Sequence, residues 1–176
     1  MKNQWPVPVG EFETVSYAQF LSAMEPFEMS EDEIKFLYEN LEIPTRATTG
    51  SAGYDFKAPF SFILTPGQTI KIPTGIRVLI QDGWWLGCLP RSGLGFKYRV
   101  QLDNTVGVID SDYYWSDNEG HIFAKITNDT HDNKILSITA GDGFMQGIFI
   151  PYGITYSDQA DGVRNGGFGS TNNSRS

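Results

Sequence analysis

Asp110 and Tyr113 are the residues whose types and spacing best suit chemistry. They lie in the run 107–113, which follows the turn residues 103–105, and the pattern predicts a β-hairpin with a carboxylate and an aromatic ring at one end. A carboxylate there can act as a general base, and the ring can pack on a sugar or be an ordinary strand aromatic. The carboxylates of Asp110 and Asp112 together can bind a metal, act as base and orienter, or cap a turn. The spacing alone favours the role in a turn.

Two further segments can hold an anion. Arg91, Ser92 and Gly93 leave an apolar run for a glycine-rich turn, where a guanidinium, a hydroxyl and backbone amides can cradle phosphate. A plain turn with a surface arginine is the alternative. Gly166–Thr171 offers amides and two hydroxyls, and its Phe168 can stack on a base. Such an arm can close over a ligand, although a ligand-free glycine-rich tail has the same composition.

Composition excludes several classes of protein. A net charge of −8 and a pI near 4.6 disfavour a protein that grips nucleic acid through phosphate contacts. The single cysteine, Cys88, excludes an intrachain disulfide, and its apolar neighbours predict a buried thiol. Two histidines and one cysteine make a structural zinc site improbable. The sequence has no bilayer-spanning apolar run and no leader pattern, so we expect no membrane association and a cytoplasmic location.

Residues 33–159 are expected to form one all-β domain. Short apolar runs, separated by turn residues at a spacing near ten, are typical of a sandwich or barrel, and no sustained helical period interrupts them. The runs are 60–64, 69–72, 76–80, 84–89, 98–102, 121–126, 134–138 and 145–150. Residues 160–176 are rich in Gly, Asn, Ser and Arg, which predicts a flexible C-terminal arm.

Residues 1–32 form an N-terminal extension that we expect to be partly helical. Apolar residues at helical spacing predict a short helix over Ser16–Met24. Ser30 and Glu33 fit a capping box, which would start a second helix. The competing interpretation makes Ile34–Leu37 the first strand of the β domain.

Taken in order, five short motifs resemble those of the trimeric deoxyuridine triphosphatase (dUTPase) family. Any one motif is weak evidence, but five in order over residues 44–172 are specific. The motifs are 44–55, Pro90–Gly95, Asn104–Tyr113, Gly141–Ile148 and Gly166–Thr171. The resemblance implies a jelly-roll or distorted β-barrel and a homotrimer with sites at the subunit interfaces.

The resemblance also implies a reaction, the hydrolysis of dUTP to dUMP and pyrophosphate. Asp110 would be the general base for attack of water on the α-phosphorus. Uracil would be read by Asn104 and by the hairpin main chain at Gly107 and Ile109, and Tyr113 would pack on deoxyribose and exclude a 2′-hydroxyl. Mg²⁺ would be the cofactor, bound through the triphosphate and waters with no direct protein ligand.

The remaining implied roles concern phosphate and the arm. Phosphates would be held by Arg91, Ser92, Gly93 and Gln146. In the arm, Phe168 would cover uracil, and the residues near the terminal phosphates would be Arg164, Gly169, Ser170 and Thr171. Asp55 and Asp112 would support the pocket.

The chain departs from the family pattern at several places. An insertion, residues 114–119, follows Tyr113, and its Tyr114 and Trp115 either pack on a neighbouring subunit or form an aromatic loop. Gly143 stands where arginine is usual, and Arg164 lies one residue closer to the double glycine. Because residues 34–44 align with the family's opening strand, we favour a strand at Ile34–Leu37.

Other functions compete with dUTP hydrolysis. The related deoxycytidine triphosphate deaminase needs a glutamate where this chain has Lys125. A nucleotide-binding regulatory protein would gain nothing from a carboxylate beside a triphosphate, so Asp110 argues against that class. The extension 1–32 and the insertion 114–119 are candidate contacts for a protein partner.

Overall fold

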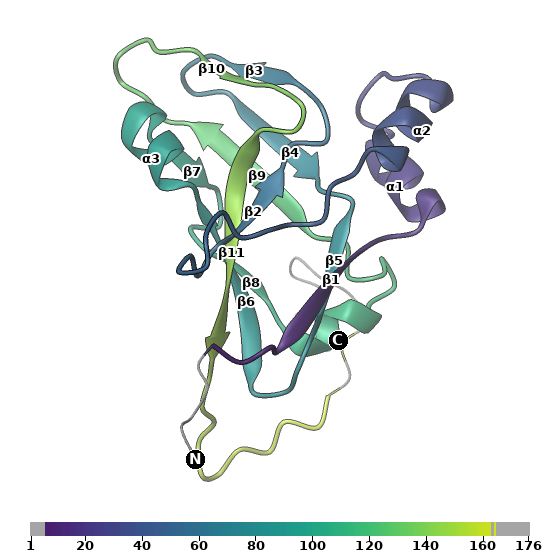
Figure 1. Cartoon of the computed structure of the whole chain (residues 1–176), viewed down its shortest axis with the longest axis vertical. Coiled ribbons are helices and arrows are strands. Elements are labelled where there is room, and N and C mark those ends of the chain that lie inside the picture. Colours follow the sequence, from purple (N-terminus) through teal and green to yellow (C-terminus); the bar gives the residue numbers. More distant parts are fainter. Residues whose placement is uncertain (1–5, 163, 165–176) are drawn as a thin grey trace, which may run out of the picture.

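Strand β11, Gly143–Pro151, lies inside a four-stranded sheet of the computed structural model, which describes residues 6–162 and 164 (Figure 1). It pairs with β2 (Tyr54–Lys57) on one side and with β6 (Trp84–Pro90) on the other. The outer edge of β6 pairs with β8 (Gly107–Ile109), so the strand order is β2-β11-β6-β8. All three pairings are antiparallel.

The other described strands form three smaller antiparallel sheets. Strand β9 (Phe123–Asn128) lies between β4 (Thr69–Pro73) and β7 (Val100–Leu102). The two-stranded sheets pair β1 (Gly10–Thr14) with β5 (Ile76–Ile80), and β3 (Phe62–Leu64) with β10 (Leu136–Ile138). Side chains alternate between buried and more exposed along β5 and much of β9, as expected for strands with one face on a core. The all-β prediction is confirmed.

The core is built from the inward faces of these strands. Its largest fully buried side chains include Phe56, Leu86, Phe144, Ile72 and Ile126. Phe20 and Met24 of helix α1 (Tyr17–Met24) are also fully buried, so the N-terminal region contributes to the same core. In the part of the chain described here, no helix is both long and apolar enough to cross a bilayer.

Helix α1 confirms the helix predicted from the apolar spacing at Ser16–Met24. Ser16 is its N-cap, and its hydroxyl oxygen accepts a hydrogen bond from the backbone N–H of Gln19 at 3.2 Å. Figure 1 shows α1 packed beside α2, apart from the four-stranded sheet.

The strand favoured at Ile34–Leu37 is wrong, because these residues lie in helix α2, Glu31–Glu39. The capping box is complete: the Ser30 hydroxyl accepts from the Glu33 N–H at 3.3 Å, and the Glu33 carboxylate accepts from the Ser30 N–H at 2.8 Å. Acidic residues at 31–33 also complement the positive end of the helix dipole. Local capping therefore outweighs the alignment with a family strand.

Three elements were not expected from the sequence. Strand β1 belongs to the expected N-terminal extension and pairs with β5, and only Phe12 of its five residues is buried. Helix α3, Ser92–Tyr98, contains two glycines, which obscured it, and ends at Arg99 in the left-handed conformation (φ 50°). Residues 111–115 form a 3₁₀ helix, η1 (Ser111–Trp115), directly after Asp110.

His121 is a fully buried polar residue at the contact of α1 with the sheets. Its Nε2 accepts a hydrogen bond from the backbone N–H of Gly75 at 2.8 Å, and its ring centre lies 4.3 Å from that of Phe123. Burial lowers the pKa of His121 to about 4. The folded protein therefore holds this imidazole neutral.

Lowering the pH should destabilise the fold through His121. Because the folded pKa lies below the unfolded value of about 6.5, His121 contributes no destabilisation above pH 6.5 and progressively more as the pH falls toward 4, by roughly 3 kcal/mol in total. Urea unfolding at pH 7 and pH 4.5 should show a smaller loss of unfolding free energy in His121→Gln than in wild type. The exposed His131 provides the control, and equal losses in His121→Gln and His131→Gln would contradict this assignment.

Candidate active site

Three predicted site residues meet just beyond the end of β8. Asp110 follows that strand and precedes η1, and the Arg164 guanidinium pairs with its carboxylate through Nη2. Arg164 Nε also lies 2.9 Å from Asp112 Oδ1, so one guanidinium bridges both carboxylates. The Asp110 side chain is 42% exposed, which leaves it open to water and to a ligand.

A cavity of about 430 Å³ opens beside this cluster. Five predicted residues line it, namely Asn104, Gly107, Ile109, Tyr113 and Arg164. The rest of the lining is largely apolar and consists of Cys88, Leu102, Val106, Val108, Ile122, Phe123 and Met145. An apolar cavity with a few fixed polar groups suits a flat heterocycle with a defined edge.

Tyr113 is held in this cavity by its hydroxyl. The ring is buried, and its Oη donates to the backbone carbonyl of His121 at 2.7 Å. Oη also accepts from the Asn118 side-chain amide at 2.8 Å. With its hydroxyl held by two hydrogen bonds, the ring can act as a rigid wall against a ligand.

Asp103 and Lys125 brace the hairpin that carries Asn104. Asp103 accepts from the Thr127 hydroxyl at 2.6 Å and lies 3.0 Å from Lys125 Nζ. Burial acts to raise the pKa of Asp103, but the Thr127 and Lys125 hydrogen bonds outweigh it and hold the pKa below its ordinary value. The sequence carries no local signal for this contact, because β7, its following turn and β9 become neighbours only in the fold.

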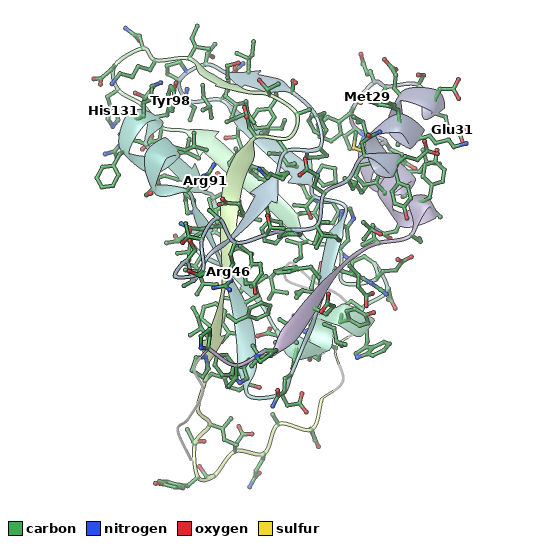
Figure 2. All side chains as sticks on the ribbon, in the orientation of Figure 1. Met29, Glu31, Arg46, Arg91, Tyr98 and His131 are labelled. Atoms are coloured by element: carbon green, nitrogen blue, oxygen red, sulfur yellow. The ribbon has the colours of Figure 1, made fainter. Side chains whose placement is uncertain are left out.

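A second cavity, of about 530 Å³, lies beyond the carboxyl end of β6 and carries the predicted anion-binding residues. Arg91 Nε lies 3.1 Å from Asp55 Oδ1, and Arg91 Nη1 donates to the Gly143 carbonyl at 3.0 Å. Figure 2 labels Arg91, whose side chain reaches β11 through this bond. Ser92 and Gly93 open α3, and Gln146 projects from β11 and donates to the Pro90 carbonyl at 3.1 Å.

Gly143 is shaped to fit Arg91. A Cβ at this position would lie 2.6 Å from Arg91 Nη1, which is closer than a Cβ atom normally comes to another heavy atom, so the guanidinium would have to move. The glycine found in place of the family's usual arginine therefore lets the Arg91 guanidinium lie directly on β11. The chain therefore has no arginine at position 143, and the Arg91 guanidinium packs closely against β11 instead.

Cys88 offers no catalytic thiol. It is buried in the wall of the first cavity, and burial raises the pKa of the Cys88 thiol to about 12. Among the described residues, no group of three or more His, Cys, Asp or Glu side chains is placed to hold a metal ion. The described residues provide a half-exposed carboxylate, Asp110, and a cavity lined by Arg91.

A family model described as dUTPase matches residues 39–176. The chain belongs to the dUTPase family. The match begins within α2, so β1, α1 and most of α2 precede the part shared with the dUTPase model.

Individual dUTPases agree with this assignment. The deoxyuridine 5′-triphosphate nucleotidohydrolase of Lactococcus lactis is 40% identical over 140 residues, which cover 78% of this chain and 92% of that relative. That of Haemophilus ducreyi is 45% identical over 112 residues, covering 62% of this chain and 69% of the relative.

Solved dUTPase structures share the fold. The crystal structure of a Streptococcus mutans dUTPase superposes with a TM-score of 0.60 at 32% identity, covering 82% of this chain and 97% of that one. A dUTPase from phage phi11 of S. aureus, at 19% identity, gives a TM-score of 0.60 over 88% of this chain and 97% of that one, and shows the fold alone.

The structure thus gathers the predicted residues into two groups. Around the first cavity lie Asn104, Gly107, Ile109, Asp110, Asp112, Tyr113 and Arg164, and around the second lie Asp55, Arg91, Ser92, Gly93 and Gln146. The predicted residues Phe168, Gly169, Ser170 and Thr171 lie outside the described residues. The functional role of every one of these residues stays a prediction.

Gly143→Ala should weaken anion binding. The added methyl would displace the Arg91 guanidinium from β11, and losing one charge-assisted contact to phosphate corresponds to an affinity reduced about tenfold or more. Calorimetric titration with pyrophosphate measures this change. Gly95→Ala, whose Cβ meets nothing within 4 Å, should bind pyrophosphate as wild type does. Equal affinity in all three proteins would contradict the role given to Arg91.

Proposed function

We propose that this chain hydrolyses dUTP to dUMP and pyrophosphate. The observation that carries the proposal is the position of Asp110, a half-exposed carboxylate that follows the lining residue Ile109 and pairs with the lining residue Arg164. The same largely apolar cavity is lined by Asn104 and by the ring of Tyr113. A base lying beside a cavity for a heterocycle and its sugar suits attack on the first phosphorus after the sugar. The named activity of the dUTPase relatives supports the same conclusion.

The first cavity would select the nucleoside. The hairpin main chain at Gly107 and Ile109 and the Asn104 side chain would read the uracil edge. Tyr113 would lie against deoxyribose, and because its hydroxyl is anchored at both His121 and Asn118, the ring cannot retreat to admit a 2′-hydroxyl. Selection of dUTP over a nucleotide with a 2′-hydroxyl would then depend on the fixed position of the Tyr113 ring.

Asp110 would act as the general base. It would take a proton from a water molecule as that water attacks the α-phosphorus, a contribution of about 10²–10⁴-fold in comparable enzymes. In the structure its Oδ2 pairs with Arg164, which also binds Asp112. Triphosphate oxygens would compete for this guanidinium and so release the carboxylate oxygen for proton transfer.

Phosphates would be bound by Arg91, Ser92, Gly93 and Gln146, with Asp55 orienting Arg91. Mg²⁺ would enter on the triphosphate, where it neutralises charge on the leaving pyrophosphate, and since this ion usually keeps phosphate and water ligands it needs no protein carboxylate cluster. A dUTPase relative from phage phi11 was solved with a structural Mg(II) ion. The arm residues Phe168, Gly169, Ser170 and Thr171 would complete the site.

The lining of the two cavities suits sites shared between subunits, as in the homotrimer that the sequence motifs imply. The two cavities have no lining residue in common, so one nucleotide would use the base cavity of one subunit and the phosphate cavity of another. Protein partners of residues 1–32 or 114–119 and a cytoplasmic location stay predictions.

Deamination of a cytosine nucleotide is the weaker candidate. Lys125 stands at the place where a glutamate would be needed, and its amino group pairs with Asp103. This position therefore offers no carboxylate to a cytosine ring.

Asp110→Asn should abolish turnover and spare binding. The amide keeps the shape of the carboxylate but cannot take a proton, so kcat for dUTP should fall about 10²–10⁴-fold. Pyrophosphate release measures kcat, and calorimetry with a non-hydrolysable dUTP analogue measures affinity. The exposed Asp158 gives the matched control, Asp158→Asn, which should retain wild-type turnover. Lost binding with unchanged turnover would refute the base assignment.

The chain should assemble as a trimer in solution. Sedimentation equilibrium should give three times the mass of the 19.6 kDa chain. A purified protein that hydrolyses dUTP as a monomer would rule out the shared site.

A further inference from the structure

The segment Glu13–Ser16 contacts the insertion that follows Tyr113. Glu13 Oε2 accepts from the Tyr114 hydroxyl at 2.8 Å and from Arg77 Nη2 at 2.8 Å. Arg77 Nη2 also donates to the Tyr114 hydroxyl at 2.6 Å, and its guanidinium carbon lies 4.1 Å from the centre of the Tyr114 ring. Strands β1 and β5 place Glu13 directly opposite Arg77, so the sheet register builds this cluster.

A second contact fixes the far end of the same loop. Glu119 accepts from the backbone N–H of Ser16 at 2.8 Å and from the Ser16 hydroxyl at 2.6 Å. Ser16 is also the N-cap of α1, so Glu119 is tied to the start of that helix. The Ser16 hydrogen bonds lower the pKa of the Glu119 carboxyl, which favours its ionised, bonded form.

These two contacts bracket the groups that hold Tyr113. Tyr114 is its chain neighbour, and residues 118 and 121, which bond to the Tyr113 hydroxyl, flank Glu119. The Gln19 amide of α1 adds a third link, 3.4 Å from His121 Nδ1. The hydrogen bonds that the Tyr113 hydroxyl makes with His121 and Asn118 therefore involve a loop that the N-terminal segment contacts.

The Tyr114 side chain is held by strong hydrogen bonds. Tyr114 is only 8% exposed, and its hydroxyl both donates to a carboxylate and accepts from a guanidinium. Charge-assisted hydrogen bonds of this kind are about twice as strong as neutral ones. Glu13 precedes the residues matched by the dUTPase model, whereas Arg77, Tyr114 and Glu119 lie within them.

We propose that Glu13, Tyr114 and Glu119 are positioning residues that set the Tyr113 ring against the sugar and so determine discrimination between deoxyribose and ribose. Figure 1 shows β1 lying beside the short helical turn that follows β8, where these residues meet. The inference rests on the proposed function, because it assigns Tyr113 to the sugar. The proposed effect is steric. A Tyr113 ring that can move leaves room for a 2′-hydroxyl, whereas a Tyr113 ring held in place excludes it.

Tyr114→Phe tests the clamp with the least disturbance, since it removes one hydroxyl and keeps the ring over Arg77. Affinities for dUMP and UMP, measured by calorimetry, give a ratio that does not depend on turnover. We expect this dUMP-to-UMP preference to fall about tenfold, because a displacement well under 1 Å suffices to change such contacts. The matched control is Tyr98→Phe, whose hydroxyl makes no described hydrogen bond and which should keep the wild-type preference.

Glu119→Gln and Glu13→Gln provide independent tests at the other contacts. Each keeps side-chain size and should lower the same preference, and Glu13→Gln combined with Tyr114→Phe should add little to either alone, because both act on one cluster. The melting temperature is measured for every variant. If these variants melt earlier but keep the wild-type preference, the contacts are only structural and the inference is wrong.

The outcomes separate the two proposals. A wild-type chain that prefers dUMP and releases pyrophosphate from dUTP, with variants whose preference is unchanged, overturns the clamp alone. A wild-type chain that binds dUMP selectively but does not hydrolyse dUTP overturns the proposed reaction, and the variants still test the clamp. A wild-type chain that binds neither nucleotide overturns both.

Discussion

The pairing of β6 with two partners is the constraint on which the site depends. Leu86–Cys88 pair with Gly107–Ile109 on one edge, and the whole of β6 pairs with β11 on the other. The first pairing delivers Asp110 at the end of β8, and the second brings Gln146 and Gly143 beside the residue that follows β6, Arg91. A one-residue slip in either register would turn these side chains to the opposite face of the sheet.

The sequence predicted which residues lie together around the two cavities better than it predicted the contacts that support them. Short motifs identified Asp110, Tyr113 and Arg91, because glycines and turn residues mark them locally. The brace between Asp103 and Lys125 was not predictable, since neither residue is unusual in its own segment and only the pairing of β7 with β9 brings them together. The pairing of Arg164 with Asp110, 54 residues away, likewise depends on the fold.

The N-terminal region shows where pattern and alignment disagree. Its capping box at Ser30 correctly predicted a helix, and the alignment with a family strand led to the wrong choice. Strand β1 carried almost no signal, because one buried phenylalanine among polar neighbours does not produce a strand pattern. Its stability comes instead from backbone pairing with β5 and from the cluster at Glu13, both of which are tertiary.

The burial of Cys88 protects its thiol from oxidants. With its pKa near 12, only about one thiol in a hundred thousand is ionised at neutral pH, and the thiolate is the form that peroxides and disulfides attack. Since Cys88 is the single cysteine of the sequence, folded copies have no accessible sulfur with which to cross-link. Reducing and oxidising surroundings should therefore leave the folded chain in the same covalent state at this residue.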